Sequence, residues 1–85
     1  MIHTEKALTV IAAALAPYVG RTMAEASPRA HCERLGIGGE GALSSADLEK
    51  LLQRLASALS VFVGGSTTES VMATIRAGLD NGGRE

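Results

Sequence analysis

Hydrophobic residues recur at helical spacing in two segments of the chain. The first stripe is Leu8, Ile11, Leu15 and Tyr18, and the second is Leu48, Leu51, Leu52, Leu55, Leu59 and Phe62. Spacings of three and four residues place apolar side chains on one side of an α-helix. Each stripe runs into a Val-Gly pair, and glycine is the residue that most easily adopts positive φ just past a helix end. The pattern therefore predicts two long helices that stop at Gly20 and Gly64.

A second helix is expected to begin directly after each glycine. Thr22 is followed three residues later by Glu25, and Ser66 is followed at the same spacing by Glu69. In a capping box, the hydroxyl accepts a backbone hydrogen bond at the helix start while the Glu side chain returns one to the cap residue. The pattern therefore predicts that each unit is a helix, a tight turn and a second helix. The turn and cap residues are Gly20, Thr22 and Glu25 in the first unit and Gly64, Ser66 and Glu69 in the second.

The two units resemble each other in sequence. At an offset of 44 residues, segments 5–25 and 49–69 agree at nine positions without a gap, including Val19/Val63, Gly20/Gly64 and Glu25/Glu69. Two alanine- and leucine-rich helices would match by chance at several apolar positions, but not as readily at glycine and glutamate. The agreement favours one helical hairpin built twice, each with an apolar face that needs the other.

Two features disturb this symmetry. Pro28 lies inside the second helix, where it removes a hydrogen bond and collides with the preceding turn, so we expect a kink or a break there. The segment between the hairpins is rich in glycine, which predicts a flexible connection. Ser44 and Ser45 can both cap the helix that follows it. No stretch alternates long enough between β-branched and polar residues to predict a strand.

These patterns predict an all-α fold, namely a four-helix bundle of two pseudo-repeated hairpins with the second helix kinked or broken near Pro28. We expect a single domain over residues 1–80, divided into a hairpin at 4–35, a linker at 36–43 and a hairpin at 44–80. Residues 81–85 are expected to form a flexible tail.

Composition limits the classes of partner. Hydrophobic residues make up 46% of the 85 residues, yet Tyr18 and Phe62 are the only aromatic ones, so the core must be aliphatic. Eight basic and nine acidic residues give a net charge of −1, which provides no basic surface for nucleic acid or an acidic membrane. The uncharged run at 7–20 is too short to span a bilayer. The single cysteine, Cys32, cannot form an intramolecular disulfide, and this fits the cytoplasm.

Few side chains offer chemistry. His31 and Cys32 are adjacent in sequence, so a helix would point them about 100° apart, and together with His3 they fall short of a zinc pattern. We expect no catalytic, metal or cofactor site. Arg21 and Arg29 are expected to form ion pairs with Glu25 along a solvated helix face.

The first helix carries apolar residues on almost all sides between positions 7 and 20. A helix of this kind is usually buried on all sides, either inside its own domain or against a second subunit. We therefore expect a homodimer formed by helix packing, with Val10, Ala14, Tyr18 and Met23 at the interface.

The segment Leu15-Ala16-Pro17-Tyr18-Val19-Gly20, followed by Met23-Ala24, resembles the small LxxYVG-type helical module at the ends of bacterial serine/threonine kinases and other signalling proteins. In that module the glycine is commonly followed by proline and a basic, alanine-rich helix, whereas this chain has Arg21 and then 25-EASPR-29. The resemblance implies a non-enzymatic protein–protein interaction or oligomerisation module in bacterial signalling or regulation. Another signalling protein is then a possible partner.

Two other functions compete with this interpretation. A small helical DNA-binding transcriptional regulator would direct Arg21 and Arg29 towards phosphate, although the balanced charge argues against nucleic acid. The layout and length are also similar to those of acyl carrier proteins, in which a modified serine begins the second helix. Ser44 and Ser45 are the candidates, but the Asp-Ser-Leu setting and the strong acidity of those proteins are missing.

Overall fold

The computed structural model describes residues 2–39 and 41–83, the last three by their backbone alone. Over this range the chain is mostly helical and belongs to the all-α class. Its elements, in chain order, are β1 (Ile2–His3), α1 (Thr4–Val19), α2 (Arg21–Leu35), β2 (Ala42–Leu43) and α3 (Ser45–Gly83).

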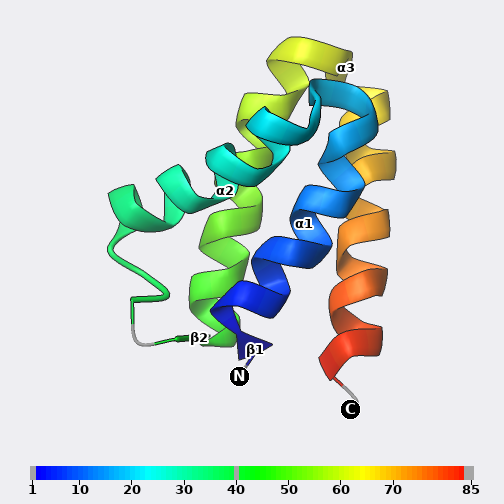
Figure 1. Cartoon of the computed structure of the whole chain (residues 1–85). Helices are drawn as coiled ribbons and strands as arrows, with labels where there is room; N and C mark the ends of the chain where they lie inside the picture. Colours follow the sequence, from blue (N-terminus) through cyan, green and yellow to red (C-terminus); the bar gives the residue numbers. More distant parts are fainter. Residues whose placement is uncertain (1, 40, 84–85) are drawn as a thin grey trace.

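The described residues form three helices rather than the four expected. Residues on both sides of Gly64 are helical without an intervening loop, so one long element spans the position where a third and a fourth helix were predicted to meet. Gly64 itself is not helical. Figure 1 shows the first part of α3 leading away from β2 and the part after Gly64 returning towards the C-terminus.

Gly20 and Gly64 share a backbone conformation that is almost closed to other residues. Their φ and ψ angles are 85° and 157° at Gly20 and 82° and 167° at Gly64. A side chain is strongly disfavoured in this region. At Gly20 the backbone N–H still donates to the Ala16 carbonyl, while its own carbonyl accepts from the Ala24 N–H, both at 2.9 Å. One residue therefore ends one helix and begins the next.

The two predicted capping boxes are wrong. Gly20 is the residue that precedes α2, no side chain caps this helix start, and Thr22 already lies inside the first turn, which contains no acidic residue. Ser66 likewise has a helical backbone, so neither it nor Glu69 caps a helix end. The glycine turns are so tight that both hydroxyl residues lie two positions past the cap position, which the glycine itself occupies. By contrast, the Ser44 hydroxyl accepts the Asp47 N–H at 3.1 Å and caps α3.

Pro28 does not split the second helix, because α2 runs from Arg21 to Leu35 with this residue inside it. Pro28 is one of the most deeply buried side chains of the molecule. Its ring packs into the interior, and only the hydrogen bond to the Ala24 carbonyl is missing. Burial on the inner face of α2 offsets that loss, so the expected break is wrong, while a kink stays a prediction.

The glycine-rich segment is tied to the start of α1. β1 and β2 pair antiparallel, with Ile2 opposite Leu43 and His3 opposite Ala42, so the expectation of no strand is wrong. Strands of two residues are too short to show alternation. The buried Thr4 donates its N–H to the Gly41 carbonyl at 2.9 Å and its hydroxyl to the Gly38 carbonyl at 3.0 Å. The connection is therefore ordered at these residues.

At the other end of the chain, α3 continues to Gly83, three residues into the segment expected to be a flexible tail. The last two residues of that segment, 84 and 85, lie outside the described part.

The core is aliphatic and is shared by all three helices. α1 packs against both α2 and α3. The core residues with the least exposed surface include Ala7, Ile11, Leu43, Leu51 and Ile75. Gly78 of α3 allows close approach, because a Cβ built there would lie 2.8 Å from Cγ1 of Val10.

Two bidentate ion pairs join residues that are more than 20 positions apart in the sequence. Both terminal guanidinium nitrogens of Arg29 on α2 donate hydrogen bonds to the Glu5 carboxylate on α1, and the distance from Nη1 to Oε2 is 2.9 Å. Arg76 donates in the same way to Glu49 within α3, across the break at Gly64. Hydrogen bonds from the guanidinium groups lower the pKa of both carboxyl groups. These pairs are exposed, so each contributes little and salt weakens it.

Substitution of Gly64 tests whether its backbone conformation sets the reversal of α3. A Cβ would meet no atom within 4 Å at either Gly64 or its neighbour Gly65, but only Gly64 has positive φ. Gly64→Ala should lower the free energy of unfolding by about 1–3 kcal/mol, measured by chemical denaturation. Gly65→Ala should change it by less than about 1 kcal/mol and in the stabilising direction. Equal effects of the two substitutions would contradict the role assigned to Gly64.

The two ion pairs predict a pH dependence. The pKa of Glu5 and Glu49 is lower in the folded chain than in the unfolded one, so their contribution is present above the unfolded pKa and is lost as pH falls through the folded pKa. Stability should decline as pH falls from about 5 to about 3, and less steeply in a Glu5→Gln/Glu49→Gln variant. Glu69→Gln is the control, and a decline as steep in the double variant as in the wild type would reject this origin.

Candidate functional site

Large apolar side chains are exposed at one end of the molecule. Among the described residues, Tyr18, Met23, Val61 and Phe62 expose 48%, 50%, 83% and 69% of their surface, and we name them the apical patch. Each of them lies within three residues of Gly20 or Gly64. Figure 1 shows both turns at the end of the molecule opposite the labelled termini. The patch is therefore assembled from both glycine turns.

The patch contains both aromatic residues of the chain, and each continues a buried stripe. Tyr18 follows Leu15 by three positions and Phe62 follows Leu59 by three positions, so each lies on the core side of its helix. Leu15 and Leu59 are buried. The chain turns at a glycine two residues after each aromatic ring, before any further turn of helix can cover it. Helical periodicity alone would have placed both rings in the core.

A small apolar hollow of about 30 Å3 adjoins the patch. It is lined by Leu15, Val19, Met23, Ser27, Leu55, Ala58, Leu59 and Phe62, and none of these side chains is charged. About one water molecule fills a space of this size. Ligand pockets measure roughly 300–1,000 Å3, so the hollow suits the tip of a side chain rather than a small molecule.

The structure separates the four residues expected at an interface into two groups. Tyr18 and Met23 are half exposed and lie in the patch. Val10 and Ala14 are partly buried against the chain's own core, and Val10 approaches Gly78 of α3. The apolar circumference of α1 is thus covered in large part by α2 and α3. Val61 and Phe62 were not predicted from the sequence as interface residues. Phe62 could have been predicted, because it aligns with Tyr18 at the 44-residue offset.

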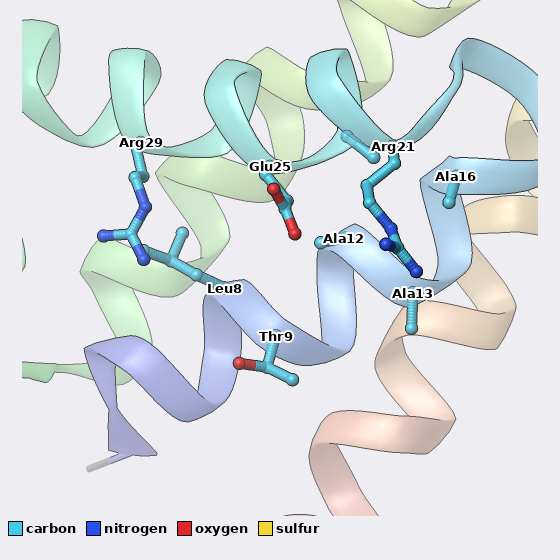
Figure 2. A pocket seen from close by; sticks show the side chains of 9 residues that line it. Leu8, Thr9, Ala12, Ala13, Ala16, Arg21, Glu25 and Arg29 are labelled. Atoms are coloured by element: carbon cyan, nitrogen blue, oxygen red, sulfur yellow. The ribbon is translucent and has the colours of Figure 1, made fainter.

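A wider groove of about 440 Å3 lies between α1 and α2. Figure 2 shows alanine side chains of α1 along one wall, with Arg21, Glu25 and Arg29 of α2 reaching over them. These three charged residues are spaced four apart, so they follow one side of α2. The groove is therefore lined by alternating charge on one side and by small apolar groups on the other.

The charges in this groove are not paired as expected. Within the described part of the chain, neither Arg21 nor Arg29 forms a salt bridge with Glu25, although the Glu25 carboxylate helps to raise the pKa of Arg29. Arg29 instead binds Glu5 across the groove, because a bidentate contact between neighbouring helices satisfies both nitrogens of its fork. The Arg29 guanidinium thus already has an anionic partner, which counts against the phosphate contact that a DNA-binding function required.

His31 and Cys32 lie on α2 away from both surfaces. Cys32 is buried, and burial raises the pKa of its thiol, which disfavours the reactive thiolate. Burial, with help from Arg34 and Arg54, lowers the pKa of His31. In the described part of the chain, no group of three or more His, Cys, Asp or Glu residues is arranged to hold a metal ion.

None of the helices, as far as the structure describes them, is both long enough and apolar enough to cross a bilayer. Comparison of the chain with protein-family models, with curated proteins and with solved structures finds no match.

Proposed function

We propose that the protein is a non-enzymatic protein–protein interaction and oligomerisation module that binds through the apical patch. The observation that carries this proposal is the exposure of both aromatic residues, Tyr18 and Phe62, at one end of the molecule. Aromatic residues and Met are enriched at protein interfaces, and aromatic residues are frequent among those that dominate binding energy.

The small size of the domain strengthens this argument. A chain of 85 residues buries a modest fraction of its surface, so its stability is marginal and each buried apolar group counts. Full burial of one large apolar side chain contributes about 1.5–3 kcal/mol. The fold nevertheless leaves Tyr18 and Phe62 48% and 69% exposed. A binding role accounts for large apolar side chains at positions that the fold leaves open to solvent.

The proposed architecture behind the patch is the pseudo-repeated pair of hairpins, a four-helix arrangement with α3 counted as two arms. Supporting this, Gly20 and Gly64 have matching backbone angles. Glu5 and Glu49, which align at the 44-residue offset, each bind an arginine on the following arm. Tyr18 and Phe62 also align at this offset and are both exposed. Each hairpin then contributes one aromatic ring to the same binding surface.

The proposed setting is the cytoplasm of a bacterium, in signalling or regulation. Cys32 is a free thiol rather than half of a disulfide, which agrees with a reducing compartment. The LxxYVG-like segment supports a signalling role, and its Tyr18 belongs to the apical patch. A homodimer or a complex with another signalling protein is the form in which the module would act.

A comparison of two neighbouring substitutions tests whether Phe62 serves binding rather than folding. Leu59→Ala removes a buried side chain and should lower the free energy of unfolding by about 2–5 kcal/mol. Phe62→Ser removes an exposed ring from the same arm and should change it by no more than about 0.5 kcal/mol. Urea denaturation at low protein concentration measures both values.

The same Phe62→Ser variant then tests the function itself. Immobilised wild-type protein should recover a binding partner from its native cell extract, or a second copy of the chain, and Phe62→Ser should recover at least tenfold less. Ala13→Ser is the matched control, because Ala13 is exposed on α1 but lines the other groove. The proposal fails if every protein recovered by the wild type, including the chain itself, is retained equally by Phe62→Ser.

A further inference from the structure

We propose that a second copy of this chain covers the apical patch, in an end-to-end contact with two-fold symmetry. This inference rests on the proposed function, since it names the partner of the same surface. In a two-fold contact the same patch is used on both molecules and must be complementary to itself. Three properties of the apical end meet this requirement.

The first property is the absence of charge at the centre of the surface. Residues 7–20 and 55–68 contain no Asp, Glu, Lys or Arg, and both stretches run to or through the glycine turns that form this end. Residues near a two-fold axis meet their own copies, so a charge there would repel itself. Arg21, the nearest charged residue in sequence to Gly20, lines the α1–α2 groove instead of the hollow (Figure 2).

The second property is that the same surface carries both projecting side chains and a recess. Phe62 projects with 69% of its surface exposed and, together with Met23, also lines the apolar hollow. A space of about 30 Å3 accepts a methyl-sized group and is too small for an organic ligand. Projections of one copy can therefore enter the recess of the other, and the reverse follows from the symmetry.

The third property is the available area. Aromatic side chains present about 150–250 Å2 each, so the exposed fractions of Tyr18 and Phe62 leave roughly 200–300 Å2 between them. Met23 and Val61 add to this area, and a two-fold contact counts it twice. The total is on the order of 1,000 Å2, near the lower limit for a specific interface. The area predicts a weak dimer whose population depends on concentration.

Sedimentation equilibrium over a wide concentration series tests this contact. The wild-type mass should rise from the chain mass of 8.7 kDa towards twice that value. Phe62→Ser and Tyr18→Ser should each weaken association at least tenfold, while Ala13→Ser should leave it unchanged. Raising the salt concentration should not weaken the wild-type dimer, because no charged pair is expected at its centre.

Circular dichroism melting at low concentration checks that both variants are folded. Phe62→Ser should melt close to the wild type, whereas Tyr18→Ser removes a side chain that is only 48% exposed and should lower the melting temperature by a few degrees. A folded wild type that stays monomeric to millimolar concentration overturns the inference. So does a dimer that Phe62→Ser and Tyr18→Ser leave intact. If the wild type is monomeric but loses a different protein partner on Phe62→Ser, the proposed function stands and the second copy is excluded.

Discussion

The conformation of two glycines determines the shape of this molecule. At Gly20 and Gly64 the chain reverses within a single residue, in a region of backbone space that a Cβ almost closes. A longer loop would have allowed one more helical turn or a capping segment to fold over the end of the core. Because the reversal is immediate, the last apolar residue of each stripe projects past the packed interior. The exposed end is thus a direct consequence of how tightly the chain turns.

The aliphatic composition follows from the same geometry. Direct turns hold consecutive helices close together near the glycines, and small residues such as Ala7, Ala24 and Gly78 permit close packing elsewhere along the helices. Aromatic rings fit poorly between helices this close, since a well-packed core has no space for extra volume. The two rings of the chain stand where the helices end and space is open. The core and the surface patch are therefore two results of one packing constraint.

The sequence predicted the helical class, the apolar stripes and the positions where the chain reverses, because periodicity and glycine chemistry are local properties. It placed helix caps at Thr22 and Ser66 wrongly, since a glycine that serves two helices at once leaves no residue free to act as a cap. It also missed β1 and β2, whose pairing brings residues 2–3 to 42–43 and depends on contacts distant in sequence. Likewise, the pairing of Arg29 with Glu5 rather than with Glu25 depends on how α1 and α2 lie against each other, which the sequence alone does not give.

The candidate surface shows most clearly where periodicity stops being informative. Leu15 and Tyr18 occupy the same side of one helix, as do Leu59 and Phe62, yet the first of each pair is buried and the second exposed. The pattern within a single helix does not separate them, and neither does distance from the turn alone, because Val19 and Val63 lie one residue nearer the glycines and still pack against the core. Internal comparison of the two halves does carry this information, because both aromatic residues precede their glycine by two positions. Here each apolar stripe ends in its largest side chain two residues before a one-residue turn, and that side chain lies outside the core, where it is available to a partner.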